Sequence, residues 1–376
     1  MDRSDFGNPF GVLMEESDYH AFIPGRIPPK IEYDNILVGE INRTEGSLGE
    51  LRATAESFPI PKALERLFGR MEAVKSSSIE GTTASFQDTL RWDLDQMSSD
   101  EARRLRMREV LNCRSILQKR WPDARSGEQL NNDTIKVMHR SLWHDMEGEE
   151  MFSGEYRLHQ NWIGGGGNMD DATYIPPPPR YVPTLMDELE AFINDPVGVP
   201  GLLQCAIVHY QFEAIHPFHD GNGRVGRIML CLMLSVHAQL IWPLDISTYI
   251  RRKQIQYQNS LFRVSTCSEW YGWFRFVLGV IQDVATGSIR RIRLLQEEIE
   301  RCKGLSSTSN GIELVDMLVE HPMVTIPQIR ARLGMSYPGA KHLVETFVEI
   351  GILTELHTKR KPRLFFAPNI MKLVHD

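Results

Sequence analysis

The segment that most constrains this chain is HYQFEAIHPFHDGNGRVGRIML, residues 209–230. An amphipathic helix is predicted to end near Ile215, a loop follows over 216–224, and a second, apolar helix begins after it. Gly221 and Gly223 let the loop turn tightly and bring backbone N–H groups close to an anion. The start of the next helix adds free N–H groups and its positive dipole end. The segment therefore predicts a helix–loop–helix unit with a phosphate cradle at its turn.

The charged residues of this loop suit phosphate chemistry. Arg224 and Arg227 are three positions apart, so they share a helix face and can bind phosphate oxygens in bidentate fashion. Asp220 offers the hard oxygen that Mg²⁺ prefers. His216 can act as a general base, because a free imidazole has a pKa of about 6.5. Taken singly, each residue also fits a structural role. The histidines of the segment leave a transition-metal site open, although no HExxH spacing supports one.

The rest of the chain up to about residue 305 is predominantly helical in pattern. Apolar residues recur at three-to-four spacing from about residue 60, and Pro61 suits a helix start. Further predicted helices span 86–97, 100–120, 131–145, 183–195, 199–215, 223–238, 247–264 and 268–302. Residues 1–35, rich in Pro and Gly, predict an extended surface arm. NWIGGGGNMDDATYIPPPP, residues 161–179, predicts an exposed hairpin or flap, because Gly permits the turn and Pro blocks a helix.

The tail beyond about residue 305 changes character. GLSSTSNG (304–311) is linker-like, and predicted helices follow at 312–320, from Ile326 or Pro327, and at 336–350. The remainder, ILTELHTKRKPRLFFAP, alternates like two strands around a basic turn, which completes the order of a winged helix-turn-helix. We therefore expect a mainly α protein in four parts: an N-terminal arm and helical region (1–110), a helical core (111–280), a connecting helix (281–304) and a winged helix (305–376).

The pattern HPFHDGNGRVGR, residues 216–227, resembles the Fic family signature HPFx[D/E]GNGRxxR at every defined position. Other stretches over about residues 60–280 look like the same family: GEYR (154–157), QNWIGG (160–165), ATYIPPPP (172–179), VPTLMDELEAF (182–192) and STYIRRKQIQYQNSL (247–261). The resemblance implies a Fic-fold helical bundle with a β-hairpin flap. It also implies a protein adenylyltransferase, with ATP as co-substrate and Mg²⁺ as cofactor, that transfers AMP to a Tyr, Ser or Thr hydroxyl of a target protein.

The resemblance also implies roles for individual residues. His216 would be the catalytic base on the target hydroxyl, and Asp220 would be the Mg²⁺ ligand. Arg224 would bind the β-phosphate and Arg227 the γ-phosphate. The ATP-binding set implied in this way comprises Phe218, Asp220, Gly221, Asn222, Gly223, Arg224, Arg227 and Tyr257.

The resemblance implies that the flap binds the target protein and that the downstream helix lies near the nucleotide base. The flap residues expected to pair with an extended segment of the target are Ala172, Thr173, Tyr174 and Ile175. In the downstream helix, Gln254 and Gln258 flank the matching Tyr257 where family members often have Arg and Tyr. The resemblance therefore implies adenine specificity less firmly than phosphate chemistry.

Upstream of the core, SSSIEG contains Ser76, Glu80 and Gly81, which match the Fic inhibitory motif [S/T]xxxE[G/N]. Glu80 can form a bidentate pair with Arg227, so that the arginine needed by the γ-phosphate is occupied. Taken without the catalytic motif, Glu80 fits a surface glutamate before a C-cap glycine. Beside that motif, the resemblance implies autoinhibition, and it leaves open whether the protein labels itself or removes AMP.

Charge and cysteine usage bound the remaining alternatives. A net charge of −7 argues against coating nucleic acid, and five scattered cysteines with no apolar leader or spanning segment predict a cytoplasmic protein that is not in a membrane. Acidic and basic residues nearly cancel in the tail, which leaves DNA binding, protein binding and homodimer formation open. The rival function is a DNA-binding transcriptional regulator whose Fic core senses nucleotide. Transfer of the γ-phosphate, as in the Doc branch, is a third.

Overall fold

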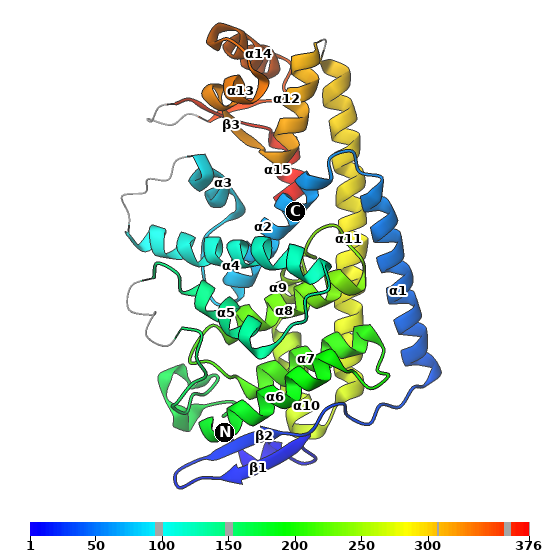
Figure 1. The fold of residues 1–376 in the computed structure, drawn as a ribbon, viewed down its shortest axis with the longest axis vertical. Coiled ribbons are helices and arrows are strands. Elements are labelled where there is room, and N and C mark those ends of the chain that lie inside the picture. Colours follow the sequence, from blue (N-terminus) through cyan, green and yellow to red (C-terminus); the bar gives the residue numbers. More distant parts are fainter. Residues whose placement is uncertain (95–100, 147–152, 307, 357–361, 376) are drawn as a thin grey trace.

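The computed structural model describes residues 1–376 apart from 95–100, 147–152, 307, 357–361 and 376. Within that part the chain is mainly helical, and the molecule is elongated (Figure 1). A β-hairpin lies at one end, a helical core in the middle, and a second helical region at the other end. None of the helices described combines the length and apolar character that crossing a bilayer requires.

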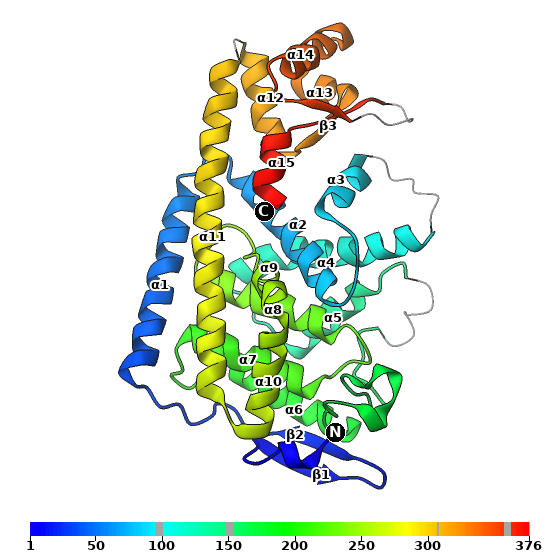
Figure 2. The ribbon, with the colours of Figure 1, turned by 180° about the vertical axis from the view of Figure 1, so that it is seen from behind.

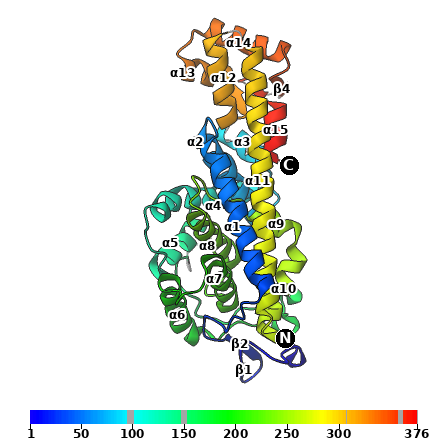
Figure 3. The same ribbon diagram turned by 90° about the vertical axis from the view of Figure 1, so that its right-hand side faces the viewer.

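Two long helices lie side by side along one flank, as Figures 1 and 3 show: α1 (Asn35–Glu56) and α11 (Trp270–Leu305). Residues 281–304, expected as a connecting helix, form the later part of α11. Helix α1 was not predicted. Asp34 caps its N-terminus, because the Asp34 Oδ1 accepts a hydrogen bond from the Leu37 N–H at 2.7 Å. The buried face of α1 consists of Leu37, Thr44, Leu48, Leu51 and Ala55, which recur at helical spacing.

The core is a bundle in which α7 and α8 pack against each other and α6 packs on α7. Its helices are α2 (Pro61–Ile79), α3 (Phe86–Leu94), α4 (Glu101–Arg125), α5 (Asn132–Leu142), α6 (Val182–Asn194), α7 (Gly201–Ile215), α8 (Asn222–His237), α9 (Ser247–Arg252) and α10 (Gln254–Cys267). The single helix expected over 247–264 is wrong, because Lys253 leaves the helical conformation (φ −115°, ψ 29°) and separates α9 from α10.

The N-terminal arm forms an antiparallel hairpin of β1 (Gly11–Glu15) and β2 (His20–Pro24), in register Leu13 to Phe22. Phe22 is fully buried, and its N–H donates to the Ile175 carbonyl at 2.9 Å. The hairpin therefore packs on the segment expected as a flap. Single turns of 3₁₀ helix lie in the arm and around the flap: η1 (Arg3–Asp5), η3 (Gly165–Gly167), η4 (Met169–Asp171) and η5 (Pro179–Tyr181).

The flap is exposed over much of residues 163–171, as expected, but three of the four residues expected to pair with a target are buried. Ala172, Tyr174 and Ile175 are buried, and Thr173 alone of the four is exposed. Ala172 and Ile175 pack with Ala21 of the N-terminal hairpin, and the Tyr174 hydroxyl donates to the Ala214 carbonyl at 2.9 Å. One β-bridge, between Ile163 and Tyr174, represents the expected hairpin. The pattern indicated an extended segment but not the N-terminal hairpin that covers it.

The region beyond α11 is here called the C-terminal unit, residues 309–375 as described. It comprises α12 (Ser309–Glu320), β3 (Met323–Thr325), α13 (Ile326–Leu333), α14 (Tyr337–Glu349), β4 (Thr354–Leu356), β5 (Leu364–Phe366) and α15 (Pro368–His375). The strands form an antiparallel sheet in the order β3-β5-β4. Helices and hairpin follow the predicted order, whereas β3 and α15 were not predicted. Most of the basic turn expected between β4 and β5 lies outside the described residues. Figure 2 shows the unit from behind, with α15 beside α11.

Candidate active site

His216 lies where α7 ends. It adopts a left-handed conformation (φ 50°, ψ 59°) that stops the helix, and its N–H donates to the Phe212 carbonyl at 3.0 Å. The imidazole Nδ1 lies 3.3 Å from the Glu213 carbonyl oxygen. Because a carbonyl only accepts, Nδ1 carries the proton and Nε2 keeps its lone pair. Burial lowers the pKa of His216 to about 4, so the imidazole is neutral near pH 7.

The loop after His216 is held by its own side chains and by neighbouring segments. The Asn222 amide closes it, accepting from the Phe218 N–H at 2.8 Å and donating to the Phe218 carbonyl at 2.9 Å. Asn161 donates to that same carbonyl at 2.9 Å. The Phe218 ring is fully buried and stacks on His139 with centroids 3.8 Å apart. Phe218 and Asn222 therefore shape the loop from within.

Two residues to which the sequence analysis gave no role complete this scaffold. Arg157, buried, donates to the carbonyls of His216 at 2.8 Å and Pro177 at 2.5 Å. His139 accepts from the Gly154 N–H at 2.8 Å and lies 2.9 Å from the Asp220 carbonyl. Burial lowers the pKa of His139 to about 4, which keeps it neutral. Arg157 stands in the quoted GEYR stretch, but its pattern gave no indication of these partners.

The far side of the loop forms the start of α8. Gly221 takes a positive φ of 80° immediately before the first turn. A Cβ at Gly223 would crowd the inhibitory pair, because it would lie 2.4 Å from the Glu80 Oε1 and 2.8 Å from the Arg227 Nη1. The buried Arg224 guanidinium lies over the Trp143 ring, 4.8 Å from its centroid, and its Nε has no hydrogen-bond partner among the residues that the structure describes. A cradle with open N–H groups and an unsatisfied buried donor fits an anion.

Asp220 is the one acidic residue of the loop. Its side chain is 68% exposed, with Oδ1 accepting from the Gly221 N–H at 2.5 Å and Oδ2 lying 3.9 Å from the Arg224 Nη2. An exposed carboxylate beside a phosphate cradle supplies the oxygen donor that a hard divalent cation requires. Asp220 therefore fits a Mg²⁺ ligand that shares the cation with substrate phosphates.

Arg227 is 2% exposed, and its partners are Ser76 on α2 and Glu80, which follows the last residue of α2. Its Nε donates to the Ser76 Oγ and its Nη2 to the Ser76 carbonyl, each at 3.0 Å, and Nη2 also donates to the Glu80 Oε1 at 2.6 Å. Glu80 contributes one of these contacts, where the sequence suggested a bidentate pair. Burial raises the pKa of Glu80, but the charge and hydrogen bond of Arg227 outweigh it, and the net pKa lies below its usual value. Gly81 follows with φ 96° and ends the helix.

Beneath Arg227 lies a buried polar layer. The Tyr257 hydroxyl is 2.8 Å from His209 Nε2, and His209 Nδ1 is 3.2 Å from the Gly226 carbonyl. Tyr257 is 5% exposed and packs near Trp273. The nucleotide contact expected for it stays a prediction. Within the described part of the chain, the buried Glu213 Oε1 has no hydrogen-bond partner. Burial raises the pKa of Glu213 to about 7. Sequence reasoning missed Glu213.

Two family models match the chain: the Fic/DOC family model over residues 129–234, which contains the whole loop, and the Fic/DOC family N-terminal model over residues 38–119, which contains Glu80. The chain belongs to the Fic/DOC family. The expected Fic-fold helical architecture is likewise confirmed.

Curated relatives match this Fic/DOC protein over the segment around the loop. The "Probable protein adenylyltransferase aq_aa38" of Aquifex aeolicus is 43% identical over 63 residues, which is 17% of this chain and 20% of the relative. "Protein adenylyltransferase fic-1" of Caenorhabditis elegans is 29% identical over 126 residues, or 33% of this chain and 22% of the relative. "Protein adenylyltransferase Fic" of Aedes aegypti is 31% identical over 106 residues, or 27% and 19%. The chain thus spans about a fifth of the length of the curated relatives it matches.

Solved structures share the fold of the Fic/DOC protein over more of its length. A Fic family protein from Desulfovibrio desulfuricans has a TM-score of 0.59 at 20% identity and covers 90% of this chain and 98% of its own. A Fic-domain-containing signaling protein from Bacteroides thetaiotaomicron has a TM-score of 0.53 at 19% identity and covers 68% of this chain and 98% of its own.

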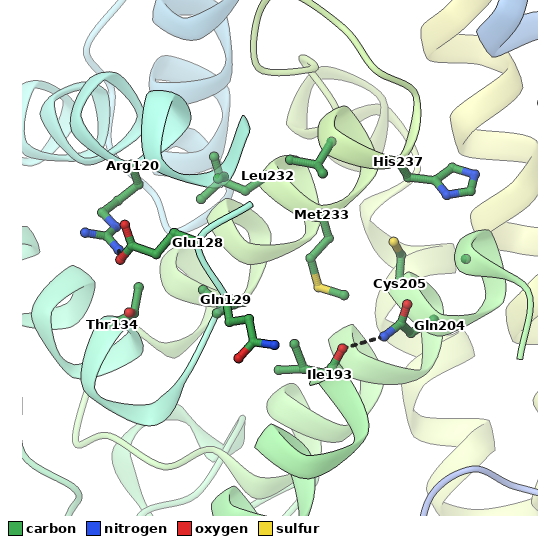
Figure 4. Close-up of a pocket in the computed structure, with 14 residues that line it drawn as sticks. Arg120, Glu128, Gln129, Thr134, Ile193, Gln204, Cys205, Leu232, Met233 and His237 are labelled. Atoms are coloured by element: carbon green, nitrogen blue, oxygen red, sulfur yellow. Dashed lines mark hydrogen bonds and ion pairs between the residues drawn. The ribbon is translucent and has the colours of Figure 1, made fainter. Parts of the chain in front are cut away.

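A cavity of about 290 Å³ lies at the opposite end of α8 from Arg227 (Figure 4). Leu232 and Met233 of α8 and Cys205 of α7 form part of its wall, and the Arg120 and Glu128 side chains stand at one edge. None of the site residues expected from the sequence is among its lining residues. The candidate active site of this Fic/DOC protein is therefore the loop itself.

Proposed function

We propose that this protein transfers AMP from ATP to a Tyr, Ser or Thr hydroxyl of a target protein, and that Glu80 inhibits the reaction by occupying Arg227. The observation that carries the proposal is the convergence of a neutral His216, the open start of α8, and Arg227 with a glutamate already bound to it. The curated relatives over the same segment are named protein adenylyltransferases.

In this mechanism His216 Nε2 takes the proton from the target hydroxyl. The oxygen attacks the α-phosphorus, the new P–O bond forms, and the bond to the β-phosphate oxygen breaks, so that pyrophosphate leaves. The N–H groups around Gly221 and Gly223 and the start of α8 stabilise the charge that develops on the phosphate oxygens. Arg224 would bind the β-phosphate and Arg227, once released by Glu80, the γ-phosphate.

Asp220 would hold Mg²⁺ together with phosphate oxygens. When bound, the cation supplies positive charge that offsets the phosphate charge. The exposed Asp220 carboxylate supports this assignment, as does its position beside Arg224.

The rival function, a nucleotide-sensing DNA-binding regulator, has less support from the geometry. A sensor has no use for a base, whereas His216 is held as the neutral tautomer with a free Nε2. The exposed basic residues of the C-terminal unit, among them Arg330 and Lys341, are compatible with either function.

The deciding experiment compares incorporation of label from ATP tagged on the α- or the γ-phosphate, into the protein itself and into other proteins. We expect Glu80→Gly to raise α-label incorporation roughly tenfold or more, because it frees Arg227. Adding His216→Ala should lower incorporation at least about 100-fold. Mass spectrometry of the product should find an added adenylyl group on a hydroxyl side chain.

A matched control is Glu56→Gly, which makes the same change at the exposed last residue of another helix, α1. It should leave incorporation unchanged. Transfer of γ-label would favour phosphoryl transfer instead. Salt-dependent binding to duplex DNA with no labelling by any variant would favour the regulator.

A further inference from the structure

The C-terminal unit contacts the same helix that carries the inhibitory glutamate at its end. Arg66, in the second turn of α2, donates from Nη1 to the Glu320 Oε2 at 3.0 Å and to the His321 Nε2 at 2.8 Å. Because a guanidinium only donates, the His321 nitrogen must be the unprotonated acceptor. Glu320 ends α12 and His321 follows it, and α12 also packs on α2 (Figure 1). The unit is therefore joined to the beginning of α2.

A second contact joins the unit to the next helix. Strand β3 packs on α3, which follows the inhibitory motif after a short connection. On α3, Asp93 accepts a hydrogen bond from the buried Arg70 of α2 at 2.5 Å. The unit thus bears on both helices that flank Glu80 in the chain.

Helix α2 links this contact to Arg227 as one continuous rod. From Arg66 to Glu80 it spans about 21 Å at 1.5 Å per residue. Halfway along, the buried Glu72 carboxyl accepts hydrogen bonds from the Ser247 N–H at 2.8 Å and Oγ at 2.5 Å. Ser76 and Glu80 then bind Arg227. A displacement at Arg66 therefore reaches Arg227 through a helix and not through a loop.

The space beside the last turns of α2 leaves room for such a displacement. A cavity of about 250 Å³ lies between Met71, Val74 and Ser78 of α2, the segment 82–86, and Val374 of α15. Close-packed interiors resist movement, so this pocket between α2 and α15 gives α2 room on the side that faces the C-terminal unit. That side is closed by the C-terminal unit.

We propose that the C-terminal unit holds α2 in the position in which Glu80 pairs with Arg227, so that moving the unit releases the inhibition. The proposal rests on the proposed adenylyltransferase function for its activity readout, whereas the contacts from which it is argued do not depend on that function. By linkage, any partner that binds the unit more tightly in its displaced position activates the enzyme, and ATP bound through Arg227 favours that partner equally.

The test breaks the Arg66 contacts in the full-length chain. Arg66→Ala should raise α-label incorporation roughly two- to tenfold, since a partly exposed pair contributes modestly. Glu320→Gln, which weakens the same contact by changing the partner of Arg66, should also raise α-label incorporation. In a Glu80→Gly background, Arg66→Ala should add nothing, because the brake on which it acts is already gone. The control Arg293→Ala removes an exposed pair between α11 and α1, 2.9 Å from Glu50, and should change neither background.

Hydrogen–deuterium exchange provides a readout that does not need activity. Arg66→Ala should speed exchange of the backbone N–H groups over residues 76–82, whereas Arg293→Ala should not. An equal rise of labelling in both backgrounds, or unchanged labelling and exchange in Arg66→Ala and Glu320→Gln, overturns the coupling. If Glu80→Gly itself incorporates no label, the proposed function fails, and the exchange measurement still decides the coupling.

Discussion

At the Arg227 guanidinium, the partners contributed by Ser76 and Glu80 leave a buried charge paired and hydrogen-bonded. Removing the partner of a buried ion strands its charge, which costs more than the pair contributes. In the proposed mechanism Arg227 exchanges one anion for another: Glu80 at rest, and a phosphate in the active state. The inhibitory contact and the substrate contact are alternatives at one side chain.

The half-buried His216 imidazole makes a prediction about pH. Its pKa of about 4 lies below that of free histidine, so the neutral base persists as pH falls and is lost only near that value. In the Glu80→Gly variant, we expect the ascending limb of kcat/KM for labelling to lie near pH 4 to 5, measured with the enzyme's stability checked at each pH. An ascending limb near pH 6.5 would contradict the neutral assignment.

Individual site residues differ in how far their role could be predicted. His216, Arg224 and Arg227 follow from the loop pattern, because their chemistry is local to it. The contact of the Tyr257 hydroxyl with His209 could not be predicted, since only tertiary packing brings the two side chains together. Arg157 and His139 act on backbone carbonyls of a loop distant in sequence, and no spacing encodes that distance.

Among the elements, α1 shows where periodicity fails as a predictor. Its apolar face is narrow and is interrupted by Thr44, whose hydroxyl accepts a hydrogen bond from Gln282 on α11 at 2.8 Å. The helix is stabilised by that neighbour more than by its own pattern, whereas α7, apolar on nearly every side, was predictable. The burial of Ala172 and Ile175 in the flap could not be predicted for a related reason: their partner, β2, lies far away in the sequence.

Packing of α1 on α11 predicts a stability effect. Leu51 is fully buried, so Leu51→Ala should lower the free energy of unfolding by about 2–5 kcal/mol, through lost burial and a residual cavity. Ile36→Ala, at a 57% exposed position on the same helix, is the control and should change it by less than about 0.5 kcal/mol. Denaturant unfolding measures both. Equal effects would mean that α1 does not pack as described.

Across the whole molecule, buried ionisable groups make the free energy of unfolding depend on pH, both below and above neutrality. The histidines at positions 139, 209 and 216 have lowered pKa values, so the unfolded chain binds protons more readily than the folded chain as pH falls below about 6.5. Burial and the nearby Asp245 raise the pKa of Glu72 to about 8, which opposes folding in the other direction. Such effects follow from burial, and therefore from the complete fold.

Glu72 isolates the alkaline side. Folded Glu72 keeps its proton up to about pH 8, whereas the unfolded carboxyl loses it near its ordinary pKa, so its contribution to stability declines as pH rises between these values. The slope is at most about 1.4 kcal/mol per pH unit. Glu72→Gln should remove this slope. The Tm of the variant minus the Tm of the native protein should therefore increase from pH 5 to pH 8. A constant Tm difference, like that expected for the surface control Glu56→Gln, would contradict the buried carboxyl.

The missing side chain of Gly223 has an evolutionary consequence. The volume that a methyl group would fill there lies against the Glu80 carboxylate in this structure, and the same backbone is proposed to approach the phosphates. The absence of a side chain at this one position thus serves both the inhibitory contact and the proposed phosphate contact. A chain without the glutamate would still gain from the glycine, because a Cβ at residue 223 would lie 2.8 Å from the Arg227 Nη1. Inhibition of this kind can therefore be lost by a single substitution at residue 80, without repair elsewhere in the loop.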